Sequence, residues 1–234
     1  RMKSAVAAMG RDPEDLQVLL IQFVTLLRNG EPVSMSKRAG AFVTLRDVMD
    51  EVGVDATRFF FVMRRCDSHL DFDLELAKRA SSDNPVYYVQ YAHARMCSIE
   101  RESDARGLER PSMDDLDPSL LSLPEELRLA TVIAKFPEEI RKAARDMAPH
   151  RIAYYAQELS EAFHSFYNVA RIIGEEEPVR RNRMLLMELT RKKLTIAAAA
   201  VAVLMGGVWL VASRTASPQL SADGIADFKA LCVA

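Results

Sequence analysis

The chain has 234 residues, of which 49% are hydrophobic and 27% charged, and its formal net charge is −2. This composition excludes a disordered polypeptide, and the length allows one sizeable core or two modest ones. The near-neutral charge excludes a uniformly basic protein, so any contact with nucleic acid must come from local patches and stacking surfaces. The first residues, Arg1 to Ser4, lack the apolar run of a signal peptide, and their helix-like character predicts a truncated chain.

A β-hairpin followed by a basic loop is predicted near the N-terminus. Residues 16–27 are an apolar run rich in branched side chains, and Asn29-Gly30 after it favours a type I′ turn. The second arm leads into residues 34–40, Ser-Met-Ser-Lys-Arg-Ala-Gly. Lys37 offers a compact ammonium and Ser36 a hydroxyl donor, which suits the binding of phosphates. From these residues alone, a solvated basic turn is the stronger alternative.

Four helices are predicted next, each from its boundary residues. Thr44 and Asp47 have the side chains of a capping box, and Gly53 suits a left-handed helix terminator. Asn84 and Pro85 are a capping residue and a first-turn proline. The predicted helices are residues 45–52, a buried helix 55–63 capped by Asp55, a helix after Asp71-Phe72-Asp73, and a long helix from 86 to 101.

The second half of the chain is predicted to be an all-helical bundle. Residues 103–118 are rich in Asp, Arg, Gly and Pro, which indicates an exposed connection. Apolar residues at helical spacing then predict three helices, 125–136, 137–147 and 149–173, the last two beginning at prolines. The predicted fold class is therefore mainly α, with a short β-hairpin.

The C-terminal part departs from this pattern. Residues 194–213 are uncharged, and a run of about 20 apolar residues is long enough to span a bilayer. The positive flank 191–193 would stay in the cytoplasm, so the segment from Met187 onward resembles the start of a separate membrane protein, as in a reading-frame fusion. The alternative is that residues 196–212 form the last, buried helix of the bundle. The absence of a polar face favours the membrane-spanning interpretation.

Aromatic side chains on two predicted helices are candidates for stacking with unpaired bases. Tyr87 and Tyr91 lie four residues apart and share one helix face, with Gln90 beside them. Core packing is an equally good interpretation of each tyrosine. Phe163 and Tyr167 repeat the helical spacing further on, where core packing is expected for Phe163 and either role for Tyr167.

Other polar residues carry weaker signals. A set of basic residues could contact RNA phosphates, although a solvated face is the stronger interpretation of each: Arg64, Arg65, Arg141, Lys142, Arg145 and Arg151. The histidines, His69, His93, His150 and His164, have no metal spacing and no paired nucleophile, so none is assigned to acid-base chemistry. The isolated cysteines, Cys66, Cys97 and Cys232, indicate neither a metal site nor a disulfide framework, and they favour a reducing cytoplasm.

Several segments in sequence resemble the arginyl-tRNA synthetases of bacteria. Residues 34–38, Ser-Met-Ser-Lys-Arg, are similar to the class I signature Lys-Met-Ser-Lys-Ser, with Ser34 and Arg38 as departures. The resemblance continues through residues 38–48, 54–60, 67–74 and 84–95, and it covers roughly residues 1–173. The last of these segments is similar to the start of that family's helical anticodon-binding domain.

The resemblance implies a domain order and an activity. It implies the end of a catalytic domain at 1–75, a helical anticodon-binding domain at 76–185 and an atypical tail at 186–234. The implied activity is ATP-dependent attachment of arginine to its tRNA through an arginyl-adenylate, with magnesium. The family's His-x-Gly-His type motif is absent from this sequence, so we expect the chain alone to be inactive. The alternative is a non-catalytic, membrane-tethered module that binds tRNA through its helices.

The resemblance also implies site residues, and a cytoplasmic location. Lys37 would be the catalytic residue that holds the ATP phosphates. The implied ATP-binding residues are Met35, Ser36, Lys37 and Arg38. The residues expected to bind tRNA are Tyr87, Gln90, Tyr91, Arg95 and Tyr167.

Overall fold

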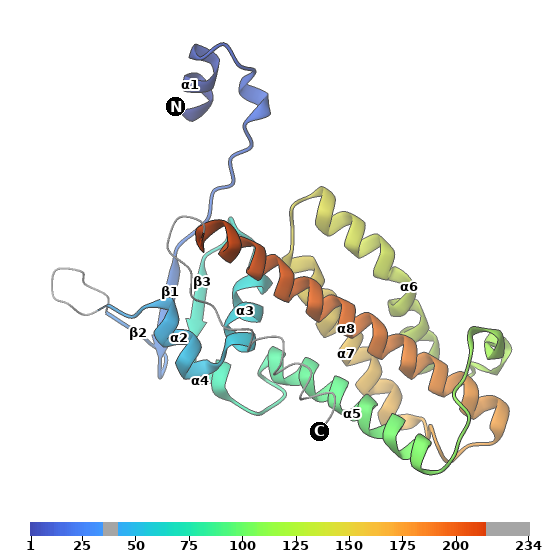
Figure 1. The fold of residues 1–234 in the computed structure, drawn as a ribbon. Coiled ribbons are helices and arrows are strands. Elements are labelled where there is room, and N and C mark those ends of the chain that lie inside the picture. Colours follow the sequence, from blue (N-terminus) through green and yellow to red (C-terminus); the bar gives the residue numbers. More distant parts are fainter. Residues whose placement is uncertain (35–41, 214–234) are drawn as a thin grey trace.

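A computed structural model describes residues 1–34 and 42–213, with the backbone alone for residues 115 and 202–213. It joins a small sheet to a bundle of long helices (Figure 1), so the mainly α fold class is confirmed. The strands are β1 Val24–Arg28, β2 Glu31–Pro32 and β3 Leu70–Asp73. The α-helices are α1 Met2–Ala8, α2 Leu45–Val52, α3 Val54–Met63, α4 Leu74–Lys78, α5 Pro85–Ala105, α6 Pro124–Arg145, α7 His150–Val169 and α8 Glu177–Ser213, and short 3-10 helices are η1 Pro13–Asp15, η2 Met113–Asp115 and η3 Pro118–Leu120.

The sheet has the strand order β2-β1-β3. β1 and β2 are antiparallel, and the turn between them has positive φ at Asn29 (53°) and Gly30 (81°), which confirms the predicted hairpin. β1 and β3 are parallel, with Val24 opposite Leu70. The strand β3 was not expected from the sequence, and the predicted extended run 16–27 joins the sheet only from Val24 onward.

Capping residues set the helix boundaries near the sheet. The Thr44 side chain accepts a hydrogen bond from the Asp47 N–H at 3.1 Å, and the Asp47 carboxylate accepts one from the Thr44 N–H at 2.7 Å, so the predicted capping box is confirmed. Gly53, with φ 89°, ends α2 and is also the N-cap of α3. The predicted cap of α3 at Asp55 was therefore wrong. Asn84 caps α5 as expected, by accepting from the backbone of Val86 at 3.0 Å.

The predicted helix break at Pro137 was wrong, because Pro137 lies inside the continuous helix α6. A proline removes one backbone hydrogen bond of its helix. Here the buried side chains Val132, Phe136 and Ala143 lie on both sides of it, and they pack into one core. Burial of this shared apolar face outweighs the local cost of the proline.

The helix α8 crosses the bundle beside α6 and α7 (Figure 1). Its residues Leu194, Ala197 and Val201 are 1%, 0% and 6% exposed, and they belong to the bundle core. Among the described residues, no helix is long and apolar enough to cross a membrane. The part of segment 194–213 up to Val201 thus packs as the last helix of the bundle, which is the alternative that the sequence left open.

The described residues form two hydrophobic cores. The larger one fills the bundle and includes Phe59 and Val62 of α3. The smaller one lies under the sheet and contains Leu26 and Phe72. Phe60 packs against both cores, so α3 connects the sheet to the helices of the bundle.

Candidate nucleic-acid interface

Aromatic side chains gather where α5 and α7 lie side by side. The rings of Tyr87 and Tyr91 on α5 are 6.2 Å apart between centroids and within 14° of parallel. Their exposed fractions are 36% and 41%, whereas Val86 and Val89 on the same helix are buried. The two tyrosines therefore leave the core face of α5 and present a pair of aligned rings to solvent, as their spacing suggested.

Arg95 connects this pair to α7. Its guanidinium lies over the Tyr91 ring at 5.2 Å and over the Tyr167 ring at 4.7 Å. It also donates hydrogen bonds to both hydroxyls, to Tyr167 at 3.0 Å and to Tyr91. These contacts restrict the rotamers of both tyrosines, and they place one positive charge within the aromatic cluster.

His164 is a member of this cluster that sequence reasoning missed. Its ring is stacked with Tyr91 at 5.5 Å and lies 4.6 Å from Tyr88. Burial lowers the pKa of His164, so the ring is predominantly neutral at neutral pH. The sequence held a signal for it, because His164 and Tyr167 are three residues apart on one helix.

Four of the five residues expected to bind tRNA therefore come together: Tyr87, Tyr91, Arg95 and Tyr167. The fifth, Gln90, is exposed on α5 at the i+3 position from Tyr87. Phe163, expected in the core, is fully buried there. The residues expected to bind ATP, Met35 to Arg38 with Lys37 among them, lie outside the described residues.

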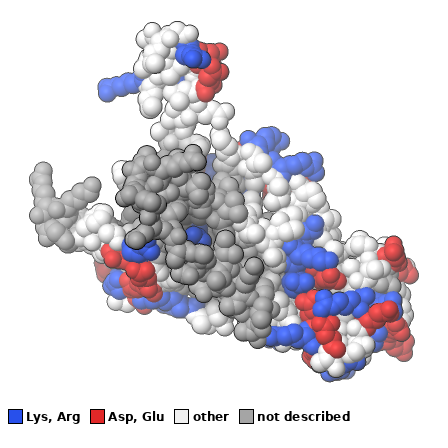
Figure 2. Space-filling model, viewed as in Figure 1, with Lys and Arg blue, Asp and Glu red and all other residues white. Residues whose placement is uncertain are grey.

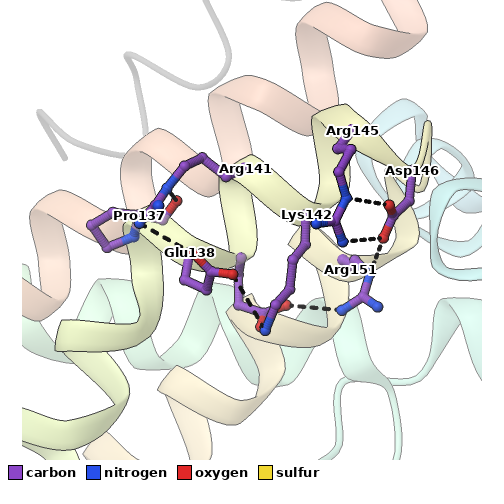
Figure 3. Close-up of polar contacts among 8 residues, drawn as sticks. Pro137, Glu138, Arg141, Lys142, Arg145, Asp146 and Arg151 are labelled. Atoms are coloured by element: carbon purple, nitrogen blue, oxygen red, sulfur yellow. Dashed lines mark hydrogen bonds and ion pairs between the residues drawn. The ribbon is translucent and has the colours of Figure 1, made fainter.

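Basic residues at the end of α6 and the start of α7 are paired with carboxylates (Figure 3). Lys142 lies 3.4 Å from Glu139, which also accepts from Arg151 at 3.3 Å. Arg145 lies 2.8 Å from Asp146. Figure 2 shows acidic and basic side chains interspersed over the end of the bundle where α5 ends and α8 begins. The described residues of that face form no uniformly basic field, and the aromatic cluster is the more distinctive feature.

The family comparison fits this arrangement. Residues 89–203 match the family of DALR anticodon binding domains. The match includes Tyr91, Arg95, His164 and Tyr167, and it ends at residue 203 within α8. The helical bundle that carries the aromatic cluster is thus similar to the DALR anticodon-binding domains over these residues.

The chain is also similar to proteins named arginine-tRNA ligase. The chain is 51% identical over 194 residues to the arginine-tRNA ligase of Syntrophotalea carbinolica, covering 83% of this chain and 35% of that protein. It is 57% identical over 178 residues to the arginine-tRNA ligase of Citrifermentans bemidjiense, covering 76% and 32%. The chain thus resembles the C-terminal part of bacterial arginine-tRNA ligases, as its sequence predicted, and spans about a third of their length.

Solved structures agree with this assignment. A structure described as an arginyl-tRNA synthetase of Campylobacter jejuni is 32% identical, with a TM-score of 0.73, over 86% of this chain and 43% of that one. The arginyl-tRNA synthetase of Thermus thermophilus has a TM-score of 0.67 over 85% of this chain and 37% of that one. At 24% identity, the second comparison supports the fold alone.

Proposed function

We propose that this chain binds the tRNA for arginine through the aromatic cluster of α5 and α7, as the tRNA-binding part of an arginine-tRNA ligase. The observation that supports this most is the pair of aligned, exposed rings of Tyr87 and Tyr91, of which Tyr91 lies at the start of the segment matched as an anticodon-binding domain and Tyr87 just before it. Unpaired bases stack on such rings, and anticodon loops supply unpaired bases. Arg95 adds a cation without requiring a basic surface.

Each residue has a distinct role in this proposal. Tyr87 and Tyr91 offer ring faces to bases, and Gln90 offers an amide that can donate to and accept from a base edge. Arg95 and Tyr167 hold the position of Tyr91 from the α7 side. His164 supports the Tyr91 ring by stacking on it, in its neutral form.

A direct test is the anisotropy of labelled tRNA for arginine titrated with the chain. We expect Tyr91→Ala to weaken binding by about tenfold or more, since base stacking on an aromatic ring contributes roughly 1–3 kcal/mol. Phe23→Ala is the control, because Phe23 is 86% exposed but lies before β1, outside the anticodon-binding domain. Equal affinity of wild type and Tyr91→Ala, or no preference over an unrelated tRNA, would exclude the proposal.

We further propose that the ligase containing this sequence attaches arginine to tRNA with ATP and magnesium, in the cytoplasm. The support is the identity of 51–57% to named arginine-tRNA ligases and the Ser34–Arg38 signature. Within that signature, Lys37 would stabilise the charge on the ATP phosphates, with Met35, Ser36 and Arg38 beside it. Removal of one such charge-stabilising group typically costs about 10²–10³ in rate. Aminoacylation by a Lys37→Ala ligase at wild-type rate would exclude this role.

A further inference from the structure

His164 of α7 lies against two tyrosine rings of α5. Its ring is stacked on that of Tyr91, with 5.5 Å between centroids and 22° between planes, and it lies 4.6 Å from the Tyr88 ring. Tyr91 is 41% exposed, and it is one of the two rings proposed above to stack with bases. The orientation of a proposed RNA-binding ring therefore depends on the chemical state of the histidine beside it.

The surroundings of His164 suit a neutral ring. Its Nε2 atom is buried and has no hydrogen-bond partner within the described part of the chain. In imidazolium both ring nitrogens are donors, and a buried donor without an acceptor is unfavourable. Burial lowers the pKa of His164, and an interaction with the Tyr88 backbone opposes this only in part. The ring is half-buried, so a protonated ring would be better solvated if it turned outward, away from Tyr91.

Arg95 makes a second positive charge at this position more costly. Its guanidinium lies over the Tyr91 ring at 5.2 Å, donates to the Tyr91 hydroxyl, and lowers the pKa of His164 by its charge. Of the charges on the elements packed against α7, that of Arg95 is the one that shifts this pKa within the described part of the chain. Arg128 and Glu161, whose charges act on Tyr88, pair with each other at 2.9 Å. An imidazolium would gain from the Tyr91 ring face, but the guanidinium of Arg95 already lies over that ring.

We propose that neutral His164 is a positioning residue for RNA binding: it holds Tyr91 in the orientation that stacks with bases, and protonation of His164 releases that ring. Protons would then act as inhibitors of RNA binding at the aromatic cluster. This inference rests on the function proposed above, and it adds regulation by pH to the same site.

The test compares the affinity for labelled tRNA for arginine with the protonation of His164, from about pH 7.5 to about pH 5 at constant ionic strength. NMR signals of the His164 ring give its neutral fraction, and fluorescence anisotropy gives the affinity. Affinity falls in proportion to the competent fraction, so we expect about threefold weaker binding once two thirds of the rings are protonated. The direction is diagnostic, because added positive charge alone would strengthen binding to RNA as the pH falls.

Two variants of His164 separate positioning from a general structural role. His164→Phe keeps an aromatic ring that cannot be protonated, so its affinity should match that of the wild type at about pH 7.5 and stay constant toward about pH 5. His164→Gln removes the ring, so its binding should be weak over the whole range. Circular dichroism checks the fold of each variant at each pH. If His164→Phe fails to fold, His164→Gln and the wild-type comparison with the neutral fraction carry the test.

His150→Gln is the matched control on the same helix. Burial and the charges of Arg65 and Arg151 lower the pKa of His150, as burial does for His164, but its ring lies 6.0 Å from Tyr154 at the start of α7. This variant should keep the wild-type fall in affinity.

A wild-type affinity that stays constant or rises toward about pH 5 overturns the proposal, and so does an equal fall in His164→Phe. Failure of the proposed function has a different signature, because tRNA binding is then absent, or unaffected by Tyr91→Ala, already at about pH 7.5. In that case nuclear Overhauser effects between the His164 and Tyr91 rings of the RNA-free chain decide. Their loss on protonation supports the positioning role, and their persistence overturns it.

Discussion

The helical bundle and the sheet region differ in how far their apolar side chains are buried. In the bundle, the large aromatic residues Phe163 and Phe166 are fully buried. Before β1, residues Leu20, Ile21 and Phe23 are 77%, 79% and 86% exposed, although they belong to the most apolar run of the N-terminal half. The large aromatic side chains of the bundle are thus buried within the bundle itself, whereas those of the segment before the sheet are exposed.

The difference shows what each region contributes. The four long helices α5 to α8 bury complementary faces against one another, so they can hold the exposed tyrosines of the cluster in fixed positions. The sheet region has only a small core under three short strands, and it joins the bundle through α3. Stability should therefore depend mostly on bundle residues, and four changes test this from the largest expected effect to the smallest.

Phe163→Ala should have the largest effect. Phe163 is fully buried and its ring contacts those of His164, Phe166 and Tyr167. Truncating such a phenylalanine leaves a cavity and typically costs about 3–5 kcal/mol. Urea unfolding followed by helical circular dichroism measures the loss. A loss below about 1 kcal/mol would show that the bundle is loosely packed at this position, and it would contradict the view that stability depends mostly on bundle residues.

Glu126→Gln should cause the next largest loss of unfolding free energy. Glu126 is fully buried, accepts from the Arg183 guanidinium at 2.6 Å, and accepts from the Leu123 N–H at 3.0 Å at the start of α6. The substitution leaves Arg183 with a weaker buried partner, and breaking a buried pair costs roughly 3 kcal/mol.

The control for Glu126 is Glu161→Gln on the surface of the same bundle. Glu161 pairs with Arg128 at 2.9 Å, but both side chains are about half exposed, at 58% and 49%. An exposed pair contributes less than about 1 kcal/mol. Equal losses in the two variants would contradict the view that burial sets the strength of these pairs.

How far the sequence predicted the fold depended on whether the signal was local. The caps at Thr44 and Asn84 and the turn at Asn29-Gly30 were correct, because each depends on neighbouring residues. The strand β3 was missed, because its place beside β1 depends on a parallel pairing between distant segments. The break at Pro137 was wrong for the same reason, since tertiary burial along α6 overrides the local preference of proline.

The candidate site was predicted in part. The spacing of Tyr87 and Tyr91 gave their common face, but nothing local showed that Tyr167, 76 positions beyond Tyr91, would meet the same arginine. His164 was missed because the histidines were considered only as metal ligands or acid-base groups, and the spacing of His164 to Tyr167 on one helix was not used. The apolar pattern of residues 194–213 could not separate a membrane-spanning helix from a buried one, since both lack a polar face; packing against the bundle decided the outcome up to Val201.

The bundle and the sheet region should also differ in the pH range over which their ionisable groups affect stability. Burial lowers the pKa of His93 and His164 in the bundle, so protons bind preferentially to the unfolded chain. Their contribution to stability is fully present above the unfolded pKa of about 6.5 and is lost as the pH falls below it. In the sheet region, hydrogen bonds from the Thr44 side chain and backbone lower the pKa of Asp47, and this contribution is lost only below about pH 4.

Urea unfolding at pH 7.5, 6.5 and 5.5 measures this dependence. We expect the free energy of unfolding to fall between about pH 6.5 and 5.5, and to fall less in a His93→Gln, His164→Gln double variant. Thr44→Ala should leave the slope in this interval unchanged, because the pKa of Asp47 lies below it. A steeper fall in the histidine variant than in wild type would contradict the assignment to the bundle.

Phe23→Ser should have the smallest effect, although it replaces one of the largest apolar side chains of the N-terminal half. Phe23 is 86% exposed, so the substitution removes little buried area and leaves no cavity, and the free energy of unfolding should change by less than about 0.5 kcal/mol. The backbone contact here, from the Leu70 N–H to the Phe23 carbonyl at 3.4 Å, does not depend on the side chain. The same urea unfolding experiment measures the change. A loss of unfolding free energy comparable to that of Phe163→Ala would show that the segment before β1 buries its apolar side chains in solution. Self-association through this segment would have that effect, and analytical ultracentrifugation of the wild type and of Phe23→Ser would then detect it.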